Sequence, residues 1–134
     1  MASLSLSAND SQGWSALQRG LKDEALVIRR KFSFLISALI TQSPDDPQVD
    51  GQNKLLEGLK SQGLIAGLVE ALKDGDVEVE ENAVRALTSA CKLDALTAEQ
   101  KKDVKSVWAA WGTEGREERG VVGEDASEIE GVFV

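Results

Sequence analysis

The sequence is poor in the side chains that carry most protein chemistry. Its 134 residues contain no His and no Tyr, and Met1 and Cys91 hold its only sulfur atoms. The lack of His excludes imidazole general bases and imidazole metal ligands, and a single Cys excludes a disulfide within the chain. Cys91 lies in the stretch LTSACK, among apolar residues at helical spacing. This setting is typical of a small buried hydrophobe rather than of a nucleophile.

Positive charge and long apolar runs are also scarce. Fifteen Lys and Arg stand against 23 Asp and Glu, which gives a net charge of −8. Nucleic acid and anionic lipid are bound through basic residues that neutralise phosphates, so we expect neither as a partner. No stretch approaches the ~18 apolar residues that cross a bilayer, and residues 1–12 lack the basic start of a secretory signal. We expect no membrane association and a cytoplasmic protein.

Helical periodicity dominates what is present. The length and the 42% hydrophobic content fit one domain with one core. Apolar residues three and four apart predict helices, and Pro, Asp and Ser predict a loop in QSPDDPQVDG, residues 42–51. Asp76 is the predicted N-cap of one helix, and Thr97 with Gln100 forms the capping box of another. The predicted helices cover residues 14–21, 24–41, 53–63, 64–73, 77–92 and 98–111.

The last segment differs from the rest. Residues 112–134 hold seven carboxylates, two Arg and five Gly, without a sustained apolar period. This composition predicts a mostly disordered acidic tail. With residues 1–12 expected to be a flexible N-terminus, residues 13–111 remain as the predicted folded domain.

The folded part contains an internal repeat. LQRGLKD, ending at Asp23, overlays LVEALKD, ending at Asp74. If one extra residue is allowed after that match, FLISAL overlays ALTSAC. Two copies of a helix–turn–helix unit are typical of a helical solenoid. The predicted fold class is therefore all-α.

These segments resemble a known repeat family. GLIAGLVEALKDGDVEVEENAVRALTSACK resembles the second and third helices of an armadillo repeat, and NKLLEGLKSQG resembles the first. Within that group, GWSALQRGLKDEALVIRRKFSFLISALI resembles the C-terminal repeats of the armadillo-type nucleotide exchange factors of the Hsp70 chaperone. The resemblance implies about two armadillo-like repeats with a C-terminal capping helix. It also implies a co-chaperone that binds the Hsp70 ATPase domain and promotes ADP release.

The sequence departs from armadillo proteins that bind extended peptides. Those proteins use a Trp and an Asn on the third helix to hold the peptide, whereas here Ser33 and Arg85 align with the Trp, and Ser37 and Ser89 with the Asn. We therefore expect docking onto a folded partner surface. The resemblance also implies further repeats upstream of this chain.

Stacked third helices line the concave side of such a solenoid, which gives a candidate binding face. The alternative is a solvated face on which Glu81 and Arg85 form an ordinary i,i+4 ion pair. The candidate partner-binding residues are Arg30, Ser33, Ser37, Glu78, Asn82, Arg85 and Ser89.

Catalysis finds little support. The glycines of residues 112–123 follow no strand and precede no Lys-Ser or Lys-Thr, so a phosphate loop is not predicted. The acids of DVEVEE suit a helix N-terminus, where the macrodipole favours them. We predict no enzyme activity and no cofactor, and the alternative to a co-chaperone is an armadillo-type scaffold without an ATPase partner.

Two apolar features complete the expectations. Trp108 and Trp111, three apart, are predicted to cover the open end of the core. The helix predicted over 24–41 is apolar on nearly every side, so part of it should stay exposed in this chain. We therefore expect marginal stability and self-association through the N-terminal end.

Overall fold

A computed structural model describes residues 11–42 and 63–133, except for the side chains of 11–15, 41 and 42. Within these ranges all regular structure is helical, as the periodicity predicted, and the chain has an all-α fold consistent with a solenoid. Three predicted segments lie outside the described residues: the flexible start apart from Ser11 and Gln12, the proline loop apart from Gln42, and the helix over 53–63 apart from Gly63. The helices are α1 (Ser11–Leu21), α2 (Leu26–Gln42), α4 (Leu64–Ala71), α5 (Val77–Lys92), α6 (Ala98–Glu118) and α7 (Glu124–Phe133).

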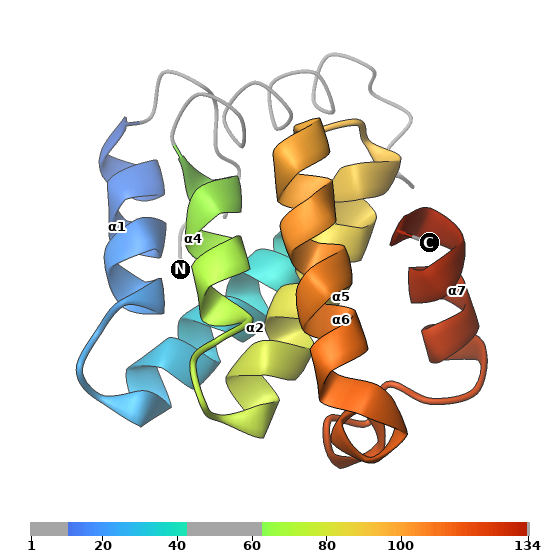
Figure 1. Ribbon diagram of the computed structural model, residues 1–134. Coiled ribbons are helices and arrows are strands. Elements are labelled where there is room, and N and C mark those ends of the chain that lie inside the picture. The colour runs from blue at the N-terminus through green and yellow to red at the C-terminus, as the bar shows by residue number, and fades with distance from the viewer. Residues whose placement is uncertain (1–10, 43–62, 134) are drawn as a thin grey trace.

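The helices form two rows (Figure 1). One row contains α1, α4 and α6, and the other contains α2, α5 and α7, with each helix packed against its neighbours in its own row and against its partner across the rows. The most extensive of these contacts joins α2 to α5. Each α-hairpin therefore stacks on the next, as a repeat architecture requires, and α6 with α7 supplies a third layer.

Local chain chemistry sets several helix ends. Asp76 has an extended backbone and its side chain accepts a hydrogen bond from the Val79 amide, so it caps α5 as predicted. Thr97 and Gln100 form the predicted reciprocal capping box of α6. Asp23 caps less directly, because its carboxylate accepts from the Ala25 amide (2.8 Å), just before α2 begins.

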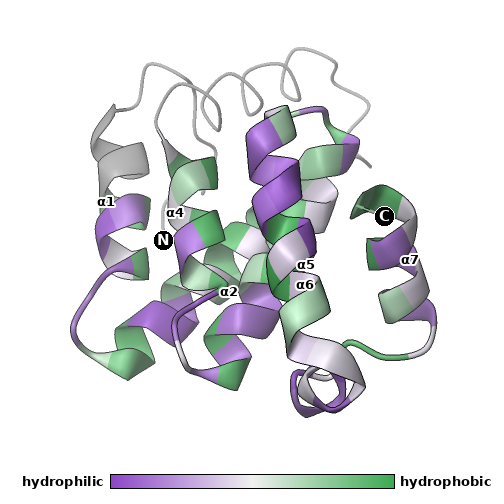
Figure 2. Ribbon diagram, viewed as in Figure 1, coloured by the Kyte–Doolittle hydropathy of each residue, from purple (hydrophilic) through white to green (hydrophobic). Residues whose placement is uncertain are grey.

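The core lies between the two rows. Figure 2 shows that the apolar positions of the helices face one another while the polar positions face outward. Repeat-related positions are buried in both copies, since Leu17 and Leu21 of α1 correspond to Leu68 of α4 and to Leu72, its C-cap. Burying side chains of this kind contributes about 1.5–3 kcal/mol each. The largest fully buried side chains are Ile36, Ile40, Leu64, Leu68, Leu72, Leu87, Val79, Val84, Val104 and Val121.

The C-terminal segment corrects the expectation of a mostly disordered tail. The helix predicted to end near Trp111 does break there, since Gly112 has a φ of 63° and a ψ of −175°, but helix resumes and runs to Glu118. A further helix, α7, then packs against α5 and α6 and buries Ile129 and Phe133. The segment folds because α5 and α6 offer it an apolar surface, which its own composition does not reveal.

Side chains from this segment cover the two tryptophans. The guanidinium of Arg116 lies 4.2 Å from the centre of the Trp108 ring, and that of Arg119 lies 4.4 Å from the centre of the Trp111 ring. Such cation–π contacts are worth about 0.5–2 kcal/mol, more when they are desolvated. Trp108 is itself almost fully buried in the core and Trp111 packs against it, as predicted for residues at the end of the stack.

One buried ion pair ties the segment to the second repeat. Arg119 donates from Nε to Oε1 of Glu80 (2.8 Å), and the Glu80 side chain is only 5% exposed. The other carboxylate oxygen of Glu80 accepts from the Gly75 amide (2.8 Å). Because the carboxylate is paired and also hydrogen-bonded, its burial is compensated.

None of the helices in the described part of the chain combines the length and the apolar character needed to cross a bilayer.

Gly20 gives a direct test of the packing between α1 and α2. A Cβ placed on this buried helical residue would overlap the ring of Phe32 in α2. Gly20→Ala should therefore destabilise the protein by about 1–3 kcal/mol, although Ala normally favours a helix by about 1 kcal/mol. The free energy of unfolding from urea titration measures the effect.

Gly131→Ala is the matched control, because Gly131 lies in α7 and its Cβ would meet nothing within 4 Å. This change should be neutral or stabilising by up to about 1 kcal/mol. Equal stabilisation by both substitutions would contradict the described contact between Gly20 and Phe32.

Candidate functional site

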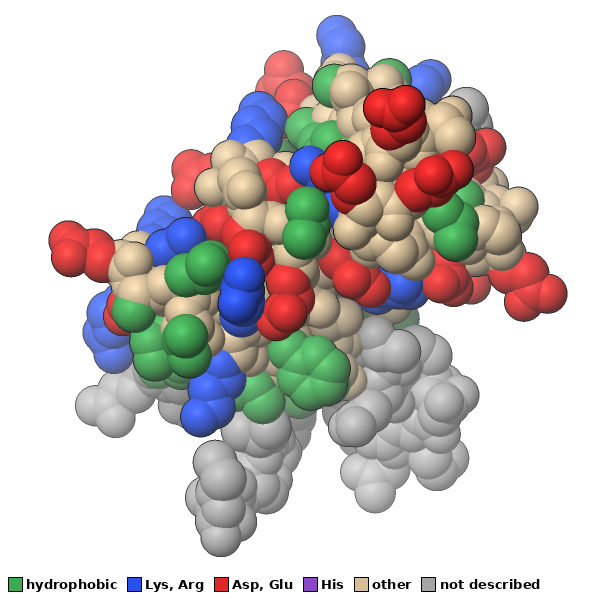
Figure 3. Space-filling model, turned by 90° about the horizontal axis from the view of Figure 1, so that it is seen from below, with side chains coloured by type: hydrophobic (Ala, Val, Ile, Leu, Met, Phe, Trp, Pro, Cys, Tyr) green, Lys and Arg blue, Asp and Glu red, His purple; other side chains and the backbone are tan. Residues whose placement is uncertain are grey.

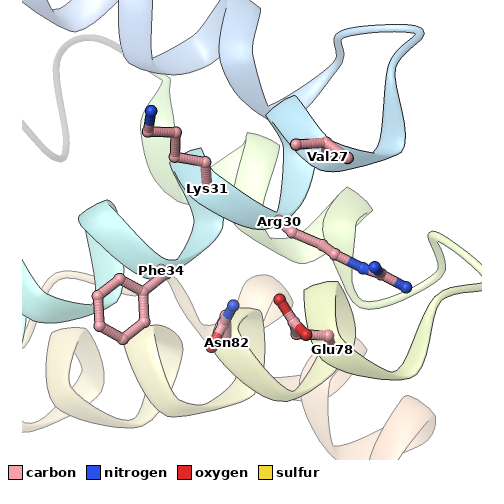
Figure 4. Close-up of a pocket in the computed structure, with 6 residues that line it drawn as sticks. All are labelled: Val27, Arg30, Lys31, Phe34, Glu78 and Asn82. Carbon is pink, nitrogen blue, oxygen red and sulfur yellow. The ribbon is translucent and has the colours of Figure 1, made fainter.

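An open groove lies between α2 and α5 (Figure 4). It encloses about 420 Å³, and α2 supplies four of its side chains while α5 supplies two. Two of the α2 side chains are apolar and unusually exposed, Val27 at 70% and Phe34 at 62%. An exposed aromatic beside polar groups is typical of a protein-contact surface. The lining residues are Val27, Arg30, Lys31, Phe34, Glu78 and Asn82.

Two arginines fasten the start of α2 to the turn between α4 and α5. Arg29 donates from Nε to Oδ1 of Asp74 (2.8 Å), and its other nitrogens reach Oδ2 of Asp74 and the backbone carbonyls of Asp23 and Glu24. The side chains of Arg29 and Asp74 are 22% and 10% exposed, so this pair is largely shielded from solvent. Arg29 thereby joins the turn before α2 to the turn before α5.

Arg30 makes the second bridge. Its Nη2 donates to Oδ1 of Asp76 (2.8 Å) and its Nε to Oδ2 (3.2 Å), which is a bidentate pair. The hydrogen bonds from Arg30 hold the pKa of the Asp76 carboxyl below its ordinary value. Viewed from the end where these turns lie, acidic and basic side chains are interspersed, and apolar side chains are exposed among them (Figure 3).

The structure brings together three of the seven residues predicted to bind a partner. Arg30, Glu78 and Asn82 line the groove. Ser33 is fully buried instead, with its hydroxyl donating to the Arg30 carbonyl (3.0 Å) and accepting from Asn82 Nδ2 (3.1 Å). Ser37, one turn further along α2, is also buried.

The other two candidates lie further along α5. Arg85 donates to Glu81 (3.0 Å), as the i,i+4 spacing predicted, and also to the Gly120 carbonyl and to Asp125 of α7, both at 3.2 Å. Ser89 is partly buried one turn later. The predicted line on α5 is therefore one face of that helix, but α7 covers its second half.

The sequence predicted that part of the apolar helix over 24–41 would stay exposed, but it did not place that part in the binding face. It placed the exposed line of α2 through Ser33 and Ser37, whereas the outward line runs through Val27, Lys31 and Phe34. Since α2 is apolar on nearly all sides, periodicity could not select the face left open by α5. The open face of α2 is defined only by the tertiary contacts between α2 and α5.

The groove offers binding surface rather than reactive groups. In the described ranges, no three acidic or Cys side chains are placed so that they could share a metal ion. Cys91 is partly buried outside the groove, and burial raises the pKa of its thiol, although Lys101 opposes this and Asp94 adds to it. A raised pKa lowers the thiolate fraction, so Cys91 suits packing better than attack.

Comparison with known proteins gives one relationship. No family model matches the chain, and no solved structure matches it. A curated protein, the Hsp70 nucleotide exchange factor FES1 of Cryptococcus neoformans var. neoformans serotype D (strain B-3501A), is 37% identical over an alignment of 114 residues, and the match covers 72% of this chain. This relationship supports the Fes1-type family for the chain. This agrees with the family resemblance of residues 13–111.

The chain spans 30% of the length of that relative. The relationship therefore supports the family, and the activity of the whole relative is only a proposal for this chain. The groove between α2 and α5 is the part of the described surface where an exposed aromatic side chain, Phe34, meets charged and polar groups.

Asp76 allows the bridge at the groove to be tested separately from the helix cap. Asp76→Ala removes both and should lower the free energy of unfolding by about 1–2 kcal/mol. Asp76→Asn keeps a good N-cap and loses only the charge, so its effect should be smaller. Urea titration of the three proteins measures both effects.

The pH dependence follows from the lowered pKa of Asp76. A carboxyl whose folded pKa lies below its unfolded value of about 3.9 stabilises fully above that value and loses the effect as pH falls through the folded pKa. The difference between wild type and Asp76→Asn should therefore shrink as the pH falls from about 5 through the folded pKa of Asp76, which lies below the unfolded value. A difference that stays constant over this range would rule out a charge contribution from Asp76.

Proposed function

We propose that this chain is a non-enzymatic co-chaperone element that binds the ATPase domain of a cytosolic Hsp70 and promotes the release of ADP. The relationship to a protein named an Hsp70 nucleotide exchange factor carries this proposal. The groove supports it, because Val27 and Phe34 are exposed on the row of helices that would face a partner.

The chemistry of the groove suits a folded partner. Phe34 supplies an aromatic anchor, Lys31 is an exposed cation, and Asn82 offers an amide beside them. Interfaces typically place such an aromatic residue at the centre with polar groups at the rim. The seven residues predicted from sequence remain candidates for this contact, with Ser33 and Ser37 acting from below the surface through the packing of α2.

Exchange activity sets a thermodynamic condition on binding. A factor that promotes ADP release must bind the open, nucleotide-free ATPase domain more tightly than the closed one, because only differential affinity shifts an equilibrium. By linkage, ADP must weaken binding of the factor by the same ratio.

The nucleotide dependence of binding is the main test. Isothermal titration of this chain into an isolated Hsp70 ATPase domain should give tighter binding without nucleotide than with saturating ADP or ATP. A coupling of about 1–3 kcal/mol corresponds to about a 5–150-fold change in Kd. Binding that is absent, or that is the same with and without nucleotide, would remove the proposal in favour of a scaffold without an ATPase partner.

Phe34→Ala tests the position of the interface. Because Phe34 is 62% exposed, its removal should change the free energy of unfolding by less than about 0.5 kcal/mol. If Phe34 is an anchor, the Kd for the ATPase domain should rise at least about tenfold.

Two valines provide a matched control for the same titration. Val27 lies in the groove and Val122 lies between α6 and α7, and both are well exposed. Val27→Ala should weaken binding and Val122→Ala should leave it unchanged. Equal effects of the two valine substitutions would place the contact outside the groove.

A further inference from the structure

The face of α5 that lines the groove continues beneath α7. Glu78 and Asn82 belong to the groove, and Arg85 and Lys92 follow on the same face of the helix at spacings of three and seven residues. In the fold, α7 supplies a carboxylate to each cation. Arg85 Nη2 lies 3.2 Å from Asp125 Oδ2, and Lys92 Nζ lies 2.9 Å from Glu128 Oε1.

These bridges are exposed and therefore weak. The side chains of Asp125 and Glu128 are 52% and 57% exposed, and surface ion pairs of this kind contribute little and are screened by salt. A third bridge, from Arg116 to Glu130 at 3.6 Å, joins α7 to α6. The remaining hold on α7 itself comes chiefly from Ile129 and Phe133, one helical turn apart.

The connection to α7 is short and glycine-flanked. Gly120 and Gly123 both have positive φ, 72° and 60°, and a side chain at Gly123 would meet nothing within 4 Å. Glycine adopts this conformation without strain and leaves it equally readily. Val121, between the two glycines, is fully buried and holds that part of the connection in the core. Gly123, directly before α7, is therefore the point at which α7 can turn away from α5 as a unit.

Resting on the proposed function, we infer that Arg85 and Lys92 form a carboxylate-binding strip that α7 occupies in this chain and vacates for an acidic surface element of the chaperone partner. The strip adjoins the groove, so one partner surface can reach both. Asp125 and Glu128 of α7 occupy the positions that carboxylates of the partner would take, and they thereby lower the affinity of the strip for the partner. Binding to the strip is then weakened by the fraction of molecules in which α7 is docked.

The experiment compares two charge-reversal pairs with equal net charge. Asp125→Lys with Glu128→Lys removes the two bridges to the strip, whereas Glu114→Lys with Glu118→Lys changes exposed acids of α6 for which the structure describes no ion pair. For each protein, the Kd for the nucleotide-free ATPase domain is measured together with hydrogen–deuterium exchange of the α7 amides.

The α7 pair of substitutions should speed exchange in α7 and tighten binding at least about threefold relative to the α6 control pair. Adding Arg85→Gln to the α7 pair should abolish this gain. In the unmodified protein, the ATPase domain should also speed exchange in α7, a result that does not depend on any variant remaining folded.

Binding that leaves α7 protected, or an α7 pair that binds no tighter than the control, would overturn the inference and leave the proposed function intact. Failure of every protein to bind the ATPase domain would remove both.

Discussion

The contact between α2 and α5 is the constraint on which the other features depend, and Arg29 fixes its register. This residue joins Asp74 of one repeat to the backbone carbonyls at Asp23 and Glu24 of the other. The turn before α2 and the equivalent turn before α5 are thereby held side by side, which fixes the register of the two helices. In this register Ile36 and Ile40 are buried in the core, while Phe34 is exposed. The groove is thus a consequence of how the repeats are stacked.

The Arg30 bridge shows why a cap and an ion pair are used together at this point. Asp76 accepts from the Val79 amide and from Arg30, so one carboxylate begins α5 and binds it to α2. A carboxylate also suits the positive end of the α5 dipole, which adds about 0.3–1 kcal/mol. Asp76 therefore caps α5 and also fixes the position of α5 as one wall of the groove.

Sequence reasoning succeeded where the determining contacts are local. Asp76 and the capping box of Thr97 act within three residues, and the starts of α5 and α6 were predicted from them. It failed where the partner is distant in the chain. Glu80 and Arg119 are 39 residues apart, and long-range contacts of this kind are what show that the acidic C-terminal segment is folded. The apolar helix over 24–41 was expected to stay partly exposed, but the sequence could not place Phe34 in the groove, because its position there depends on which side of α2 meets α5.

The rigidity of the groove limits how this chain could promote nucleotide exchange. The start of α2 is bridged to the start of α5, and Ser33 and Asn82 link the two helices further along, so the walls of the groove are fixed to each other. Under the proposed function, groove walls that are fixed to each other can discriminate between nucleotide states only if the ATPase domain changes shape between those states. The difference in affinity between open and closed ATPase domain must then arise from how well each presents one surface to Phe34 and to the strip beneath α7.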